Sequence, residues 1–265
     1  RRRSRRRSRR RSRRRRRRRR SSSSKWNAIW EKKGLKSLRA GQISSIDKLL
    51  AADGFEGSSG ASKLHQFVAS VVAHHIAPGD NVAEVAAGSG PLIFMTAELF
   101  REAAAFRENG AVHFTGIDYA KHLLELGLQY AQALPKDHPA HLTNFLQADA
   151  TDMGQLPDGS FELVYMNSAL QYMNSIRHAQ RVVIEMLRLV TRPGKVIIFD
   201  IQDEAFKTQC LDNRVKVKYA DHQQRVQNDS NGLGRLFVPR QAMLEVGKRL
   251  ACETEVFKTK VLTQD

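Results

Sequence analysis

The sequence predicts an α/β fold, with a doubly wound and mostly parallel sheet that carries helices on both faces. Beyond Gly79, short apolar runs alternate with longer stretches of helical periodicity. A helical stretch follows most of the predicted strands, which is typical of right-handed βαβ units. About 240 residues follow the arginine-rich first segment, enough for one sizeable domain with a buried core.

The N-terminal part of the domain is predicted to be helical. Trp26 and Trp30 lie on one face of a short helix that Gly34 is expected to end. A second short helix follows, with Ser45 as its N-cap. A longer helix is predicted over 62–76, where the sequence APGD stops it.

The rest of the domain is predicted to contain five strands that alternate with helices. LPDGS forms a turn before the fourth strand, and RPG closes a helix before the fifth. A last helix is expected over 239–250. The strands are predicted at 81–86, 111–117, 143–148, 161–167 and 195–201, and the other helices near 91–107, 120–133 and 175–191.

The strong positive charge of the chain belongs to its first segment. Residues 1–20 are seventeen arginines and three serines, while the whole chain has 44 basic and 27 acidic residues and a net charge of +17. The remainder therefore holds 27 basic and 27 acidic side chains and is neutral. Without apolar residues the segment is expected to stay unfolded. It is either a solvated tail or an arm for a nuclear address, RNA contact or organelle targeting.

Cysteine use and hydropathy bear on the cellular compartment that we expect for the protein. Cys210 and Cys252 lack C-x-x-C spacing, which argues against a disulfide framework and a zinc site. We expect an intracellular protein, cytoplasmic or nuclear, with organelle targeting by the tail left open. No stretch approaches the roughly 18 to 20 apolar residues of a membrane span. The chain begins with Arg1, which indicates a processed protein or a fragment, and nothing indicates its oligomeric state.

The stretch VAEVAAGSGPL, residues 82–92, joins the first strand to a helix. Gly88 and Gly90 allow the backbone to approach a ligand that a side chain would block, and Glu84 and Ala86 precede them. Neither a third glycine nor a G-K-[ST] sequence follows, so the dinucleotide and P-loop fingerprints both fail. The alternative is a plain turn between strand and helix.

Acidic residues follow the next two strands. Asp118 ends the second strand in TGIDYA, where an acid can accept hydrogen bonds from a ribose, and Tyr119 is expected in the same site. As a lone residue Asp118 could instead cap a helix. After the third strand, Asp149 and the amide of Ala150 are placed to meet the edge of an adenine, or else to form a capped turn.

Polar and aromatic residues are predicted at the same edge of the sheet. Asn167 and Tyr172 follow the fourth strand and are placed to orient a substrate, a positioning role in catalysis. Trp26, Trp30 and Phe55 would cover the pocket as a lid. The alternative for these aromatic residues is simple packing of a helix against the domain.

Five motifs in order carry a family resemblance. They are EVAAGSG, GIDYA, ADATDM, LPDGSFELVYMNSALQYM and EMLRLVTRPGKVIIFDI. Over roughly residues 62–201 the chain resembles the class I S-adenosylmethionine-dependent methyltransferases. The resemblance implies a Rossmann-like, mostly parallel sheet of seven strands, and S-adenosyl-L-methionine as the cofactor.

The resemblance also implies places for the site residues. The glycine loop would lie under the methionine portion of the cofactor, with Glu84 near that portion or near the loop amides. Asp118 would bind the ribose hydroxyls, and Asp149 with Ala150 the adenine. The segment from Asn167 onward would line the end where the methyl group is transferred.

Two departures from the family pattern stand out. Ala86 replaces the first glycine of the loop, which is tolerable if this residue keeps strand-like backbone angles. The family sheet ends in an antiparallel pair of strands, and only the first of these is expected, over 252–262. A missing last strand indicates a truncated C-terminus.

The expected organisation is a tail and one domain. Residues 1–24 form the disordered Arg/Ser-rich tail, and 25–265 form the methyltransferase domain. Within it we expect an N-terminal helical lid at 25–76, a cofactor-binding core at 77–201, and a cap insertion with the C-terminal part of the sheet at 202–265.

The function implied is transfer of a methyl group by in-line displacement to a small-molecule nucleophile. SALQYM lacks the Asn-Pro-Pro-aromatic motif typical of relatives that methylate amino groups of DNA and RNA. The alternative is an RNA- or protein-directed methyltransferase, or a non-catalytic methyltransferase-like binding protein, recruited by the tail. Nucleic acid would then be contacted through residues 1–20.

Overall fold

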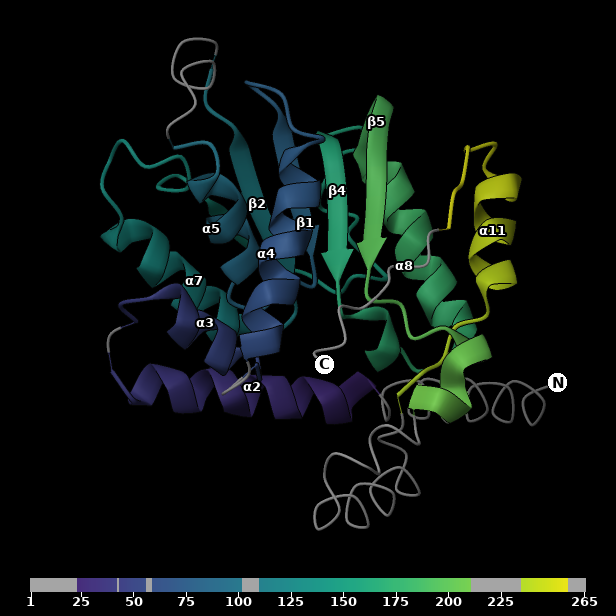
Figure 1. Ribbon diagram of the computed structural model, residues 1–265, viewed down its shortest axis with the longest axis horizontal. Helices are drawn as coiled ribbons and strands as arrows, with labels where there is room; N and C mark the ends of the chain where they lie inside the picture. Colours follow the sequence, from purple (N-terminus) through teal and green to yellow (C-terminus); the bar gives the residue numbers. More distant parts are fainter. Residues whose placement is uncertain (1–22, 42, 56–58, 102–109, 211–234, 257–265) are drawn as a thin grey trace, which may run out of the picture.

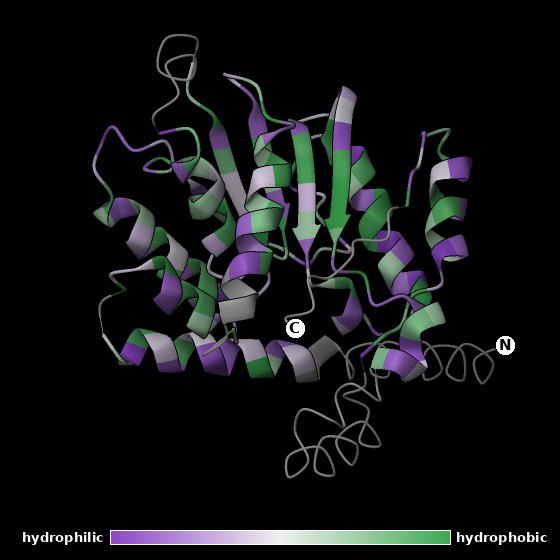
Figure 2. Cartoon of the chain, viewed as in Figure 1, coloured by the Kyte–Doolittle hydropathy of each residue, from purple (hydrophilic) through white to green (hydrophobic). Residues whose placement is uncertain are grey.

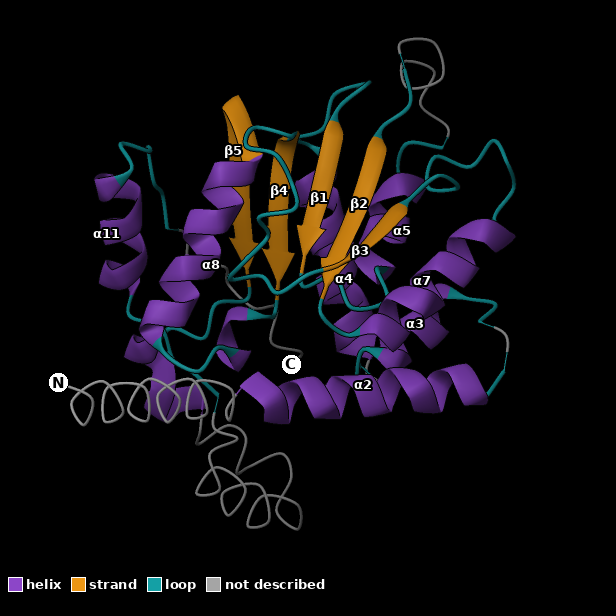
Figure 3. Ribbon diagram, turned by 180° about the vertical axis from the view of Figure 1, so that it is seen from behind, coloured by secondary structure: helices purple, strands orange, loops and turns teal. Residues whose placement is uncertain are grey.

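The computed structural model describes residues 23–41, 43–55, 59–101, 110–210 and 235–256. Its centre is a five-stranded parallel sheet in the order β3-β2-β1-β4-β5, as Figures 1 and 3 show. The strands are β1 (Asn81–Val85), β2 (His113–Asp118), β3 (Asn144–Gln147), β4 (Phe161–Asn167) and β5 (Val190–Phe199). The predicted parallel sheet with helices on both faces is confirmed.

Helices cover both faces of the sheet and one of its edges. In Figure 1, α4 lies in front of the sheet, and from behind, in Figure 3, α8 lies in front of it with α11 alongside. The helices are α2 (Ser23–Arg39), α3 (Ile46–Ala52), α4 (Ser59–Ala73), α5 (Pro91–Glu98), α7 (Lys121–Ala133), α8 (Ile176–Leu189) and α11 (Arg240–Arg249), with 3-10 turns η1 (Leu170–Tyr172) and η2 (Glu204–Phe206).

Two hydrophobic clusters, one on each face, hold these layers together. Successive strand residues point to opposite faces, so Leu163 and Tyr165 join the cluster under α4, α5 and α7. Val164 and Met166 join the cluster under α8 and α11. All four side chains are buried, and Figure 2 shows hydrophobic residues concentrated in the strands. Both faces of the central strands are therefore apolar, as in other parallel sheets.

The strand order reverses between β1 and β4, and that reversal positions the site. In an open α/β sheet a ligand binds beyond the carboxyl ends of the strands at such a point. Helix α2 lies across these carboxyl ends in Figures 1 and 3, and η1 follows β4 there. The N-terminal helices thus close the edge at which the predicted site residues meet.

Helix α2 contradicts the prediction that a short helix ends at Gly34. The helix continues to Arg39, and Gly34 is buried in its interior. A Cβ at Gly34 would lie 2.8 Å from the backbone nitrogen of Leu123 and 2.9 Å from the carbonyl carbon of His122. The glycine therefore allows two helices to approach closely, where the local sequence alone indicated a helix end.

A carboxylate of α2 also caps the beginning of α7. Helix α7 has no side-chain cap from its own N-cap residue, Ala120. Glu31 accepts hydrogen bonds from the backbone nitrogens of Lys121, at 2.8 Å, and His122, at 3.4 Å. Burial alone would raise the pKa of Glu31, but the hydrogen bonds from His122 and these amides lower it overall. Contacts between α2 and α7 therefore include both close backbone packing and an ionised cap.

Two boundaries in the second half of the chain differ from the prediction. Helix α8 ends at Leu189 and β5 begins at Val190, so RPG lies inside this strand rather than before it. The antiparallel strand predicted at 252–262 is absent from 252–256, and 257–262 lies outside the described residues. The described residues thus form five of the seven expected strands.

Several other expectations fall outside the described residues. These include most of the expected tail, 1–22, and the centre of the expected cap insertion, 211–234. Within the described part of the chain, no helix has both the length and the hydrophobicity needed to cross a membrane.

Candidate active site

A cavity of about 100 Å³ lies at the carboxyl edge of the sheet. Its walls come from the loops that follow β1, β2 and β4, from η1, and from the N-terminal helices. The predicted site residues that line it are Trp30, Phe55, Glu84, Ala86, Gly88, Asp118, Tyr119, Asn167 and Tyr172. Motifs far apart in the sequence therefore meet in one place.

The turn after β1 has left-handed backbone angles at three positions. The φ angles are 59° at Ala86, 58° at Gly88 and 75° at Gly90. Gly90 does not line the cavity, but it begins α5 and lies against Phe145, where a Cβ would come within 2.9 Å of the ring. Ala86 therefore does not meet the condition of strand-like angles under which an alanine would be tolerated here without strain. A non-glycine residue in this conformation costs about 1–2 kcal/mol.

Asp118 ties the end of β2 to this turn. Its Oδ2 accepts a hydrogen bond of 2.9 Å from the backbone nitrogen of Gly88, and its Oδ1 accepts one of 2.8 Å from Ala120. The side chain is buried, and this burial raises its pKa to about 6 although the backbone amides favour the ionised form. The predicted ribose acid and glycine loop are thus in direct contact.

Glu84 lies on β1 and is buried in the wall of the cavity. The hydroxyl of Tyr165, on the neighbouring strand, donates a hydrogen bond of 3.2 Å to its Oε2. Burial raises the pKa of Glu84 well above its ordinary value, and the carboxyl of Asp53 raises it further. The cavity therefore brings several carboxyl groups near one another.

Asp53 is a site residue that sequence reasoning missed. Both of its carboxylate oxygens accept hydrogen bonds from the backbone nitrogen of Ser89, at 3.1 and 3.2 Å. The Ser89 hydroxyl donates a further bond of 3.2 Å to the carbonyl oxygen of Leu49. The sequence AADGF indicates only a turn after a helix, so no local pattern connects Asp53 with the glycine loop 36 residues later.

The loop after β4 supplies polar groups on the other side of the cavity. The Asn167 side chain is 9% exposed, and its Oδ1 has no hydrogen-bond partner among the described residues. The Ser168 hydroxyl donates a bond of 2.6 Å to Oδ2 of Asp200, which follows β5. Both Ser168 and Asp200 have positive φ angles, 53° and 50°. Strained residues of this kind cluster at functional sites.

Aromatic side chains close the cavity from the N-terminal helices. The rings of Trp26 and Trp30 pack on Tyr172 with centroids 4.7 and 5.6 Å apart. Phe55 packs edge-on against His65, a buried lining residue that was not predicted. Trp26 lies behind Tyr172 rather than in the lining. Packing and covering the pocket are thus combined in the same aromatic residues.

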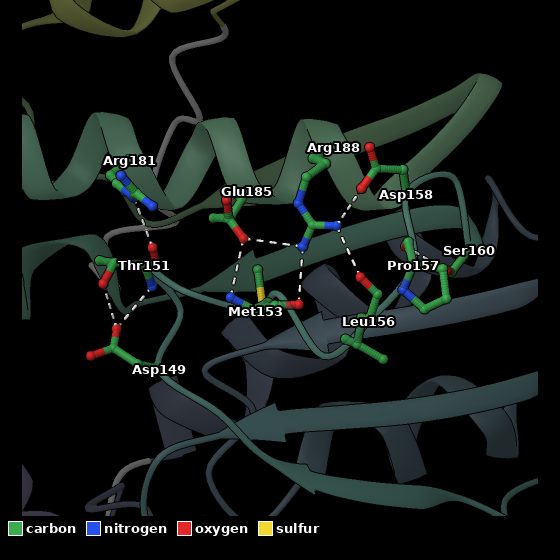
Figure 4. Close-up of polar contacts among 10 residues, drawn as sticks. All are labelled: Asp149, Thr151, Met153, Leu156, Pro157, Asp158, Ser160, Arg181, Glu185 and Arg188. Atoms are coloured by element: carbon green, nitrogen blue, oxygen red, sulfur yellow. Dashed lines mark hydrogen bonds and ion pairs between the residues drawn. The ribbon is translucent and has the colours of Figure 1, made fainter.

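Asp149 and Ala150, expected at the adenine, do not line the cavity. The Asp149 carboxylate accepts bonds from the backbone nitrogen and the hydroxyl of Thr151, at 2.8 and 2.7 Å, as Figure 4 shows. Arg181 donates to the carbonyl oxygen of Thr151, so α8 holds this turn. This is the capped-turn alternative, and the adenine contact stays a prediction.

The segment after this turn is fixed by Arg188 of α8. In Figure 4 its guanidinium reaches the carbonyl oxygens of Met153 and Leu156 and the carboxylates of Asp158 and Glu185. The Asp158 and Glu185 carboxylates raise the pKa of Arg188 against its partial burial. One buried side of α8 thus positions the chain between β3 and β4.

Comparison with known proteins agrees with this arrangement. A family model described as a methyltransferase domain matches residues 96–199, from within α5 to the end of β5. The matched region is similar to the methyltransferase domain family and spans less than half of the chain. The family resemblance seen in the sequence is thereby confirmed, and among curated proteins no match was found.

Solved structures to which the chain is similar include several methyltransferases. One is a complex between the Haloferax volcanii Trm112 methyltransferase activator and a methyltransferase, with 17% identity, a TM-score of 0.49, and coverage of 78% of this chain and 77% of that one. Another is the magnesium protoporphyrin IX methyltransferase of Synechocystis with S-adenosylmethionine bound, with 16% identity, a TM-score of 0.45, and coverage of 64% and 72%.

A third similar structure is the [4+2]-cyclase SpnF, with 20% identity and a TM-score of 0.37. The match covers 48% of this chain and 41% of SpnF, so the methyltransferase domain spans less than half of that protein. Each of the three TM-scores lies below 0.5.

Proposed function

We propose that the protein transfers a methyl group from S-adenosyl-L-methionine to a nucleophile on a small molecule, by in-line displacement. The observation that carries this proposal is the contact between Asp118 and the Gly88 amide, at the point where the strand order reverses. A methyltransferase family match over residues 96–199 supports the same chemistry.

The residues of the cavity suit the proposed cofactor. S-Adenosylmethionine supplies a methyl group that its own positive sulfur already activates. Asp118 and Tyr119 would hold the ribose hydroxyls, and Glu84 would face the methionine portion. Carboxylates on these walls complement a ligand with positive charge and hydroxyl donors. The cavity volume of about 100 Å³ is below the roughly 300–1,000 Å³ of ligand pockets, so binding is expected to displace α2 or the segment after Asp53.

Residues after β4 would orient the methyl acceptor. Asn167 offers its Oδ1, which has no partner within the described part of the chain, and Tyr172 presents a ring held by two tryptophans. Trp30, on α2, would exclude water from the reacting atoms. The contribution of these groups is alignment, because a nucleophile must approach the methyl carbon from the side opposite the sulfur.

Substitution of Asp118 tests the cofactor assignment. We expect Asp118→Ala to weaken S-adenosylmethionine binding at least about tenfold in calorimetry, because a carboxylate that binds ligand hydroxyls is lost. Asp118→Asn keeps an acceptor for the Gly88 amide and checks that the loop remains folded. The control is Asp137→Ala, an exposed acid outside the cavity lining. Unchanged affinity in a folded Asp118→Ala protein would sink the assignment.

The runner-up is a methyltransferase directed to RNA, or to a protein, by its arginine tail. The seventeen arginines of residues 1–20 favour this candidate, since a strongly basic segment can bind phosphates without sequence preference. The neutral body does not favour it, because 27 basic and 27 acidic residues give no net positive charge. We therefore propose that the tail takes no part in methyl transfer, although it could bring the domain to a phosphate-bearing partner.

A further inference from the structure

Asp53 lies between the N-terminal helices and the cofactor turn. Its carboxylate binds the backbone amide of Ser89, and a Cβ placed on Gly88 would be 2.7 Å from both carboxylate oxygens. The side chain also lines the cavity. Asp53 is therefore close to the part of the loop that the proposed cofactor would cover, and it comes from outside the five motifs.

The cavity around Asp53 is rich in hydrogen-bond acceptors. Glu84 and Asp118 place two further carboxyl groups in its lining. The carboxyl of Asp118 raises the pKa of Asp53, and the carboxyl of Asp53 raises the pKa of Glu84. Asn167 lines the same cavity, and its buried Oδ1 has no donor among the residues that the structure describes. Burial raises the pKa of Asp53 well above its ordinary value, and the nearby cation Lys33 opposes this only in part. Such a set of acceptors is costly to bury unless a donor-rich cation joins it.

The backbone donors of the same turn are already engaged. The Ser89 amide is bound to Asp53, and the Gly88 amide is bound to Asp118. A carboxylate entering this part of the cavity would therefore meet two occupied amides and three carboxyl groups. An ammonium group carries three N–H donors and a positive charge, and it would find acceptors there.

We propose that Asp53 accepts a hydrogen bond from the α-ammonium group of the cofactor's methionine portion, an inference that rests on the proposed function. The N-terminal segment then forms part of the cofactor site itself, in addition to covering the acceptor. Asp53 contacts the cofactor at its amino-acid end, away from the methyl group that is transferred.

Three ligands distinguish a contact of Asp53 with the ammonium group from a contact with the sulfonium and from a purely structural role in the loop. S-Adenosylmethionine has the ammonium and the sulfonium, S-adenosylhomocysteine keeps the ammonium but has a neutral sulfur, and 5′-methylthioadenosine has neither. Calorimetry with Asp53→Asn should show a loss of affinity of about 10-fold to 100-fold for the first two ligands. For methylthioadenosine the affinity should stay within about 2-fold, because only the amino-acid portion is missing a partner.

The matched control is Asp47→Asn, an exposed acid on the same helix α3, which should leave all three affinities unchanged. Equal losses for all three ligands would overturn the inference, since Asp53 would then act only through the shape of the loop. A loss confined to S-adenosylmethionine would instead indicate contact with the sulfonium. Tighter binding of the two amino-acid ligands would mean that Asp53 competes with the ligand carboxylate.

Ligand affinities of the wild-type protein test the ammonium contact independently, including in the case that Asp53→Asn fails to fold. An S-adenosylhomocysteine analogue without the α-amino group should bind the wild-type protein about 10-fold to 100-fold more weakly than S-adenosylhomocysteine. Equal affinity would overturn the ammonium contact. If the wild-type protein binds none of these ligands, the proposed function itself fails. If it binds all of them and Asp53→Asn changes none of the affinities, only the inference about Asp53 fails.

Discussion

At the scale of single residues, Ala86 combines an unfavourable backbone conformation with a place in the cavity wall. Its φ of 59° suits glycine, which stands at this position in the family pattern. Ala86→Gly should relieve about 1–2 kcal/mol of strain and lose about 0.5–1 kcal/mol through the larger entropy of the unfolded chain. We therefore expect the free energy of unfolding to rise by up to about 1.5 kcal/mol. Denaturant titration measures this, and a clear decrease would contradict the conformation.

Asp118 makes both stability and cofactor binding depend on pH. Burial raises its pKa from 3.8 to about 6, so the folded state holds this proton more tightly than the unfolded chain. The resulting stabilisation is full below pH 3.8 and is lost as the pH rises through about 6, on the order of 3 kcal/mol for this group. Denaturant titrations from pH 4 to 7 should show a steeper decline for the wild type than for Asp118→Asn.

Cofactor affinity is expected to change in the opposite direction. The ionised carboxylate is the stronger acceptor for ribose hydroxyls, so affinity should increase as the pH rises through about 6. Calorimetry in two buffers of different ionisation enthalpy would reveal the proton released on binding. Affinity that is constant between pH 5 and 7.5 would speak against a role for Asp118 in the cofactor site.

At the scale of elements, the contact between α2 and α7 depends on the missing side chain of Gly34. Alanine favours a helix by about 1 kcal/mol over glycine, but its Cβ would lie 2.8 Å from the backbone of Leu123. Gly34→Ala should therefore lower the free energy of unfolding by about 1–3 kcal/mol and weaken cofactor binding. Thermal unfolding and calorimetry measure both effects. Lys36→Ala, on an exposed position of α2, is the control, and a stabilised Gly34→Ala protein would contradict the close packing.

The sequence could predict features that depend on local patterns, but not features that depend on contacts between distant segments. The fourth strand, expected at 161–167, is β4 with the same bounds, and the helix expected at 120–133 is α7 at Lys121–Ala133, because local periodicity and turns determine both. Gly34 was misjudged because its role depends on a helix about 90 residues away. Asp118 and Gly88 were found since they belong to one motif series, whereas Asp53 and His65 enter the site only through tertiary packing.

At the scale of the whole molecule, the arginine tail and the neutral body should act separately. Deletion of residues 1–22, which precede α2, should leave S-adenosylmethionine affinity unchanged. If the tail binds phosphates, the full-length chain should bind RNA with an affinity that falls steeply as salt rises, and the shortened chain should not. Fluorescence anisotropy with labelled RNA at several salt concentrations measures this. RNA binding that survives the deletion would place a nucleic-acid site on the body.

The cap that Glu31 provides for α7 links the position of α2 to the ribose end of the proposed cofactor site. The first turn of α7 directly follows Asp118 and Tyr119, and its amides at Lys121 and His122 are satisfied from α2. When α2 moves away, that turn loses its acceptor and can fray, so the ribose end of the site loosens at the same moment. On the proposed function, release of the spent cofactor is expected to require α2 to separate from α7, and we predict that turnover follows this conformational rate rather than methyl transfer.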